Sequence, residues 1–258
     1  MTAVVPPMSM AGLDVVDVCR DLIRFDTSNP GSTERACAEH VAGLLTDLGL
    51  APTVLEAEPG RTNVVVRVAG SDPTLPALLV HGHLDTVPAE RADWTRDPFG
   101  GEVVDGCVWG RGAVDMKNAV AMYLAALSRV LADGGGPARD VVLAFVADEE
   151  AGGTAGAAFL MHEHRQLFDG CGAVIGEVGG FNLRARDGVP TFAISVADKG
   201  LRWYELQQRG VAGHGSMIAE DNPILGLART VQAIAGQRVE YVVLEPMRRL
   251  ASDLAGRP

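Results

Sequence analysis

Apolar residues recur every three to four positions, the spacing of an amphipathic helix, in several stretches of the chain. Ser32 can cap the helix that Gly49 ends, while Asn222 and Pro223 suit the first turn of a later helix. The pattern predicts helices over residues 15–25, 33–48, 117–131, 155–167, 222–234 and 247–255.

Between the earlier helices lie short apolar segments that are typical of strands. The segment 141–146, Val-Val-Leu-Ala-Phe-Val, is apolar throughout, as expected for a strand that is covered on both faces of a parallel sheet. Strands are predicted at residues 63–68, 77–80, 141–146 and 173–175. Their alternation with helices predicts an α/β fold, in which a mostly parallel sheet is flanked by helices.

The pattern changes near residues 185–190. Residues 191–196 and 201–207 alternate between apolar and polar side chains like antiparallel strands, and residues 238–244 suit a further strand. We therefore predict two domains, one over residues 1–187 and a second, smaller α+β domain over residues 188–258.

Composition and charge narrow the possible classes of protein. The 258 residues carry a net charge of −11, which disfavours binding to nucleic acid and to anionic membrane surfaces. The four cysteines are far apart and form no CxxC pair, so we expect reduced thiols. The N-terminal residues lack the basic and apolar regions of a signal peptide, and no apolar run reaches the ~20 residues of a membrane span. The predicted location is the cytoplasm.

Polar motifs lie at the ends of the predicted strands. HGHLDTVP (81–88), ADEEAGG (147–153) and IGEVGG (175–180) each follow or end an apolar strand, and GRGAVDMKN (110–118) leads into a helix. Open α/β sheets bind ligands beyond the carboxyl ends of their strands. The placement of these motifs therefore predicts a functional site at that edge of the sheet.

The residue types in these motifs point to a metal centre. Imidazole and carboxylate groups are the usual ligands of catalytic zinc, and two zinc ions can share a bridging carboxylate and a bridging water. His83 with Asp85 suits a carboxylate–histidine–zinc triad, and Asp115 is a short carboxylate that can reach two metals. Of the adjacent Glu149 and Glu150, one can bind metal while the other takes a proton from the water.

Together with AGHGS (212–216), these motifs resemble the dizinc family of aminoacylase, acetylornithine deacetylase, succinyl-diaminopimelate desuccinylase and glutamate carboxypeptidase. The resemblance runs from about Leu22 to Asn222. It implies a zinc-exopeptidase-like catalytic domain over residues 1–187, and it makes residues 188–258 the start of an inserted lid or dimerisation domain.

The resemblance also implies roles for individual residues. One zinc is held by His83, Asp115 and Glu177, and the second by Asp115 and Glu150. The side chain of Asp85 orients His83. Glu149 acts first as general base toward the bridging water and then as general acid, and His214 in the lid stabilises the oxyanion and binds substrate, often across a dimer interface.

The sequence departs from the family pattern after the lid. The family takes a final histidine ligand for its second zinc from a late segment, and no histidine follows His214 here. We therefore expect a chain that is truncated relative to the family, with a second metal site that lacks a ligand.

The leading interpretation is a metal-dependent amide hydrolase, a deacylase or exopeptidase acting on small N-acyl amino acids or peptides. Its expected cofactor is two Zn²⁺ per complete site, with Co²⁺ or Mn²⁺ as alternatives, and a homodimer through the lid domain is its expected assembly. The second interpretation is a truncated, catalytically silent member that keeps one metal site and a binding or dimerisation role. A third is an unrelated α/β binding protein without tight metal binding.

Overall fold

The computed structural model describes residues 12–31, 33–177, 179–184, 188, 190–196, 204–216, 222–238 and 240–255. The chain divides into two compact units, Met1–Glu177 and Val178–Pro258. The predicted boundary near residues 185–190 lies inside the second unit. The roles of the two domains, as a catalytic domain and a lid, stay predictions.

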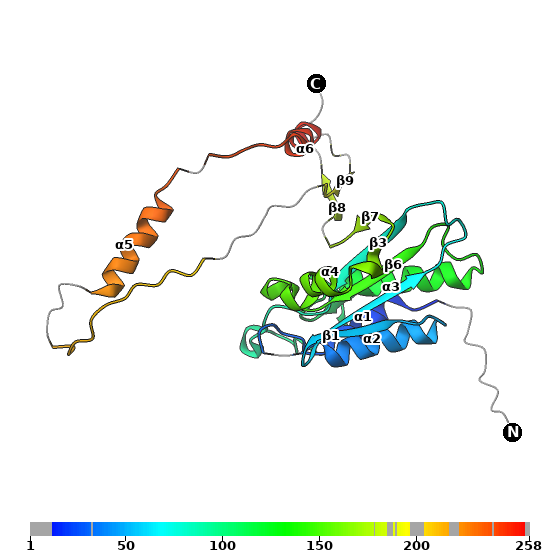
Figure 1. The fold of residues 1–258 in the computed structure, drawn as a ribbon, viewed down its shortest axis with the longest axis horizontal. Helices are drawn as coiled ribbons and strands as arrows, with labels where there is room; N and C mark the ends of the chain where they lie inside the picture. Colours follow the sequence, from blue (N-terminus) through cyan, green and yellow to red (C-terminus); the bar gives the residue numbers. More distant parts are fainter. Residues whose placement is uncertain are drawn as a thin grey trace. The chain divides into compact units, whose positions relative to one another are not determined.

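The first unit is built on a five-stranded sheet with the strand order β1-β2-β6-β3-β7 (Figure 1). β6, β3 and β7 are parallel neighbours, whereas β2 is antiparallel to both β1 and β6. Four strands therefore point in one direction and β2 alone in the other. The bounds are β1 (Thr53–Glu58), β2 (Arg61–Val68), β3 (Ala77–His83), β6 (Val141–Val146) and β7 (Cys171–Ile175).

Helices cover both faces of this sheet, as the sequence predicts for an α/β fold. Successive side chains of a strand point to opposite faces, and in β2 Val64 belongs to one buried cluster and Val65 to another. The first cluster contains side chains of α1 (Val15–Ile23), α2 (Arg35–Asp47) and α3 (Lys117–Ala132). The second contains Leu160 of α4 (Phe159–Glu163). The sheet is thus the middle layer of the unit, and its two cores lie on either side.

Three short strands of this unit were not predicted. β1 is an edge strand whose residues are exposed or half-buried, and its sequence Thr-Val-Leu-Glu-Ala-Glu contains two glutamates, which are rare in strands. β4 (Glu102–Val104) and β5 (Cys107–Trp109) form a separate antiparallel hairpin of three residues a side. Strands this short or this exposed show no clear apolar alternation in the sequence.

The helix predicted over residues 155–167 is broken. It consists of a π-helical turn, Thr154–Ala158, the single turn α4 and a 3-10 turn, Arg165–Phe168. Gly156 has non-helical backbone angles, and a Cβ atom there would lie 1.8 Å from the carbonyl oxygen of Ala147. The close approach of this segment to the end of β6 therefore prevents a continuous helix.

The second unit contains the hairpin β8 (Gly179–Arg184) with β9 (Pro190–Ile194), followed by α5 (Pro223–Ala235) and α6 (Glu245–Ala255). Both late helices were predicted, and the Asn222 side chain caps α5 by accepting a hydrogen bond from the Ile224 amide at 3.0 Å. The strands predicted at 201–207 and 238–244 are wrong for residues 204–207, 238 and 240–244, which form neither strand nor helix. Residues 201–203 and 239, like the Ser32 cap, lie outside the described residues.

No helix in the described ranges is long and apolar enough to cross a membrane.

Candidate metal centre

His83 is the last residue of β3, in the middle of the parallel part of the sheet. It pairs with Val146, the last residue of β6, so the segment 147–153 that follows β6 begins beside it. β7, the other neighbour of β3, leads to Glu177. The parallel register thus gathers three of the polar motifs at one edge, where the sequence predicts the site.

Asp115 and Glu177 form one group of potential metal ligands with His83. The Nε2 atom of His83 lies 3.0 Å from Oδ1 of Asp115 and 3.8 Å from Oε2 of Glu177. The donor atoms of the three residues all lie within 4.8 Å of one another. This is the ligand trio that the resemblance implies for the first zinc. The structure brings its members together, while their role as ligands stays a prediction.

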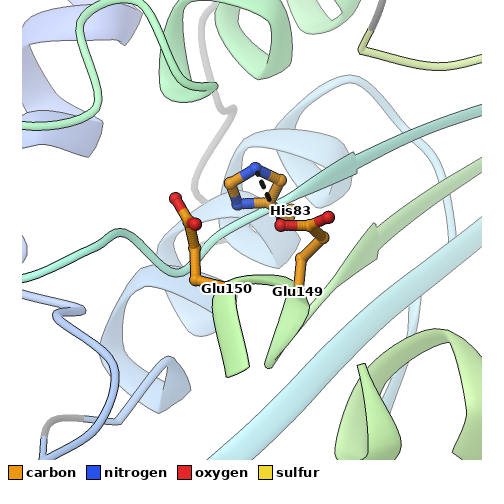
Figure 2. A group of neighbouring side chains, drawn as sticks. All are labelled: His83, Glu149 and Glu150. Carbon is orange, nitrogen blue, oxygen red and sulfur yellow. Dashed lines mark ion pairs between the residues drawn. The ribbon is translucent and has the colours of Figure 1, made fainter. Parts of the chain in front are cut away.

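Glu149 and Glu150 form a second group with the same histidine. The Oε2 atom of Glu149 lies 3.9 Å from Nε2 of His83, and the donor atoms of this trio also fit within 4.8 Å. Figure 2 shows the two glutamate side chains extending from one turn toward the imidazole, on either side of it. His83 is therefore shared by both groups, whereas the resemblance assigns Asp115 as the shared ligand.

The Asp85 carboxylate links the segment that bears His83 to the turn that bears Glu149 and Glu150. It is completely buried and accepts hydrogen bonds from the backbone amides of Glu149 and Glu150, each at 3.1 Å. Its Oδ1 atom lies 3.5 Å from Nδ1 of His83, but the backbone carbonyl oxygen of Asp85 is nearer to that nitrogen, at 2.9 Å. Asp85 therefore holds His83 mainly through its backbone, and its side chain holds the Glu149–Glu150 turn.

Buried contacts position the other two segments. The Lys117 ammonium, enclosed in the core, donates a hydrogen bond to the Phe25 carbonyl at 2.8 Å and so anchors the start of α3 beside Asp115. The Tyr123 hydroxyl of α3 donates to the Gly176 carbonyl at 2.8 Å, next to Glu177. The positions of Asp115 and Glu177 thus both depend on α3.

The turn that carries Glu149 and Glu150 requires unusual backbone angles. Asp148 has φ of +68°, and Gly152 and Gly153 have φ of +110° and +71°. Glycine adopts such angles without steric cost, and Asp is one of the few other residues that tolerates them. The motif DEEAGG thus has a local reason for each of these residue types.

The electrostatics of the site reflect crowded carboxylates around one imidazole. Burial raises the pKa of Glu177, and the neighbouring Asp115 carboxylate adds to this effect, bringing the value to about 7. Burial and Asp115 also raise the pKa of Glu150. Burial alone would lower the pKa of His83, but the carboxylates of Asp85 and Glu149 outweigh it and raise the value to about 9.

These residues fit a divalent metal ion. The donor set combines one imidazole nitrogen with carboxylate oxygens, the ligand types of catalytic zinc sites. Burial, and after it the neighbouring Asp115 carboxylate, raises the pKa of Glu150 and of Glu177, and a bound cation would favour the ionised form of both groups. Because such ligands must be deprotonated to bind a metal ion, protons and metal compete for the same atoms.

A buried polar network beneath the site was not predicted from the sequence. Arg61 bridges the carboxylates of Glu34 and Asp148 at 2.9 and 2.8 Å, and the Asn29 amide donates to both Asp85 and Asp148. These residues come from four distant segments. Besides Asp85, which the sequence singles out, only two of these residues have a signal: Asn29, in the helix-breaking Thr-Ser-Asn-Pro, and Asp148, beside the glutamates.

His214 lies in the second unit, where its Nδ1 atom is 2.7 Å from the Ser216 hydroxyl oxygen and the side chain is exposed. Its role toward oxyanion and substrate stays a prediction.

Known proteins resemble this chain in sequence over most of its length. Aminoacylase-1 from Sus scrofa is 31% identical over 226 residues, which cover 86% of this chain and 54% of the relative. A succinyl-diaminopimelate desuccinylase from Rhodospirillum centenum is 33% identical over 233 residues, which cover 88% of this chain and 58% of the relative. The chain thus spans little more than half the length of these relatives.

Solved structures share the fold at lower identity. Human carnosine dipeptidase 1 superimposes with a TM-score of 0.57 at 24% identity, covering 66% of this chain and 40% of the dipeptidase. The metallo-carboxypeptidase Sso-CP2 of Sulfolobus solfataricus gives a TM-score of 0.54 at 19% identity, covering 68% of this chain and 39% of that protein. The sequence matches the pattern of peptidase family M20/M25/M40 over residues 79–251, well over half of its length. The chain therefore belongs to peptidase family M20/M25/M40.

Proposed function

We propose that the chain carries the metal centre of an amide hydrolase, a deacylase or exopeptidase that acts on small N-acyl amino acids or peptides. The observation that carries this proposal is the position of His83, a buried imidazole at the end of a central parallel strand. Its Nε2 atom lies within 3.9 Å of the Asp115, Glu149 and Glu177 carboxylates, and Glu150 belongs to the same group as His83 and Glu149. His83, Asp115 and Glu177 would hold one zinc, and Glu150 with Asp115 part of a second.

Zinc bound there would supply Lewis acidity, which polarises an amide carbonyl and lowers the pKa of water. The chain's own contribution is the transfer of protons. Glu149 has an exposed side chain, 54% accessible, on a turn whose backbone is fixed by Asp85. In the proposed reaction its carboxylate removes a proton from the attacking water and then gives that proton to the nitrogen of the leaving amine.

The proposed substrate class rests on the relatives. Two of them are named for the removal of acyl groups, an aminoacylase and a desuccinylase, and a structural neighbour is named a dipeptidase. An acylase, a desuccinylase of an amino acid and a dipeptidase, as their names indicate, each act on an amide bond. The homodimer through the lid, the cytoplasmic location and the preference for Zn²⁺ over Co²⁺ or Mn²⁺ are part of the same proposal.

The test measures metal content and turnover together. The purified 258-residue chain is stripped with a chelator and reconstituted with Zn²⁺, Co²⁺ or Mn²⁺. Metal per chain is then counted, and hydrolysis of N-acetyl amino acids, N-succinyl amino acids and dipeptides is followed. Metal binding with hydrolysis of one of these classes supports the proposal. About one metal per chain without turnover would favour a silent metal-binding member, and no metal binding would contradict both.

Metal affinity is expected to rise with pH. A metal ion must displace the protons held by Glu177 below a pKa of about 7 and by His83 below a pKa of about 9. The association constant for Co²⁺ should therefore rise about a hundredfold per pH unit below pH 7 and about tenfold per unit between pH 7 and 9. Titrations with Co²⁺ between pH 5.5 and 8.5 measure this slope. An affinity independent of pH would show that these two groups are not displaced.

A further inference from the structure

Asn29 lies on a segment that is fastened to the loop after β3. Its backbone amide donates to the Thr86 carbonyl at 2.8 Å, and the Thr86 amide donates to the Thr27 carbonyl at 3.1 Å. The Thr27 hydroxyl donates to the Leu84 carbonyl at 2.7 Å. These bonds join residues 27–29 to residues 84–86 on both sides of Asp85, so the Asn29 side chain is held against the Asp85 carboxylate.

The Asn29 amide connects two carboxylates. Its Nδ2 atom donates to Oδ2 of Asp85 at 3.0 Å and to Oδ1 of Asp148 at 3.1 Å, and the residue is only 6% exposed. Its oxygen faces Arg61 at 3.4 Å. An amide nitrogen has two hydrogens and can serve both carboxylates, whereas an aspartate of the same shape has none. The position therefore calls for an amide.

The two carboxylates that Asn29 joins determine the course of the ligand-bearing turn. Asp148 precedes Glu149 and binds the Ala155 amide through its Oδ2 atom at 2.9 Å, while Asp85 accepts hydrogen bonds from the amides of Glu149 and Glu150. Asn29 thus ties the segment after β3, which bears His83, to the turn after β6, which bears both glutamates. Within the described part of the chain, its side chain is hydrogen-bonded to Asp85, Asp148 and Arg61 and to neither the glutamate carboxylates nor the imidazole.

We propose that Asn29 is a positioning residue of the metal centre, which sets the distance between His83 and the Glu149–Glu150 turn by bridging Asp85 and Asp148. This inference rests on the proposed function, since it concerns how the same site holds metal. Asn29, in the Thr-Ser-Asn-Pro segment, would therefore affect the metal only indirectly, through Asp85 and Asp148.

The first variant is Asn29→Asp, which keeps the shape of the side chain and removes both donated hydrogen bonds. The expected result is a Co²⁺ affinity about tenfold weaker than that of the wild-type chain, because loss of a group that supports the ligands typically weakens metal binding 10–100-fold. The visible absorption band of bound Co²⁺, which reports coordination geometry, should change as well. Binding is measured at low temperature, where circular dichroism verifies that each variant is folded.

The second variant separates positioning from a purely structural role. Combining Asn29→Asp with Asp148→Asn exchanges amide and carboxylate, and asparagine tolerates the positive φ of position 148. An amide donor, now at position 148, again connects positions 29 and 148. Arg61, which reaches both positions, then faces a carboxylate at position 29 instead of at position 148. Asp85, however, still lacks its amide partner. We expect the exchange to raise the melting temperature toward that of the wild type but to leave Co²⁺ binding about tenfold weak.

The control is Asp140→Asn, which alters a surface contact at the other end of β6, where Asp140 pairs with Arg67 at 2.8 Å. Its Co²⁺ affinity should stay within about twofold of wild type, as expected for a surface ion pair away from the site. Wild-type affinity in Asn29→Asp, or affinity restored by the exchange, would overturn the role of Asn29 alone. A wild-type chain that binds no Co²⁺ would instead overturn the metal centre itself.

Discussion

Replacing Glu149 with glutamine is expected to lower amide hydrolysis by about 10²–10⁴-fold, the usual contribution of a general acid–base residue. Glutamine keeps the size and the backbone contact with Asp85 but cannot accept the proton of the attacking water. The metal content of Glu149→Gln should equal that of the wild-type chain, because the proposed ligands remain. Turnover with saturating N-acyl amino acid and metal counted per chain measure the two effects.

Glu150→Gln should mainly lower metal binding, since Glu150 is proposed as a ligand. Its metal content should fall, and activity should recover in part at higher metal concentration. Glu163→Gln on α4, an exposed glutamate of the same unit, is the control and should change neither quantity. The structure places Glu149 and Glu150 in one group with His83. Loss of metal from Glu149→Gln but not from Glu150→Gln would therefore reverse the two roles.

The elements of this fold that the sequence predicts correctly are those with buried, regular patterns. β6 reads Val-Val-Leu-Ala-Phe-Val because both of its faces are covered, and α1 and α3 show their apolar stripes. β1 was missed because it lies at the sheet edge with its residues largely exposed. The sequence predicts a helix over residues 155–167 that is too long, because the break at Gly156 is caused by its close approach to Ala147. This tertiary contact leaves no periodic signal in the sequence.

The candidate site divides in a similar way. His83, Glu149, Glu150 and Glu177 could be placed together from the sequence because each ends or follows one of three strands, β3, β6 and β7, which lie parallel and bring their ends side by side. Asn29, Glu34 and Arg61 could not, because their contacts with Asp85 and Asp148 depend on how α2, β2 and two loops pack. Residues that support a site from distant segments show no characteristic spacing in the sequence.

Replacing Asp85 with alanine is expected to lower the free energy of unfolding of the metal-free chain by about 3–5 kcal/mol. The substitution removes a completely buried carboxylate, leaving the backbone amides of Glu149 and Glu150 without their acceptor and the Asn29 amide with only one of its two acceptors. Each unsatisfied buried donor costs about 1–3 kcal/mol, and part of the sum is regained because a buried charge is removed. Urea unfolding in the presence of a chelator measures the loss without any contribution from metal.

The metal-free measurement distinguishes two ways in which Asp85 can act. If its carboxylate served only to orient His83, Asp85→Ala would weaken metal binding by the 10–100-fold typical of such partners but would cost less than about 1 kcal/mol of metal-free stability. Asp85→Asn, which keeps one acceptor oxygen and the shape, should fall between wild type and alanine in stability. The observed contacts favour a larger role, because the carboxylate holds the Glu149 and Glu150 amides more closely than it holds the imidazole. On this view Asp85 serves first to join the loop after β3 to the turn after β6. The proposed metal would then bind to side chains whose positions are already fixed in the metal-free chain.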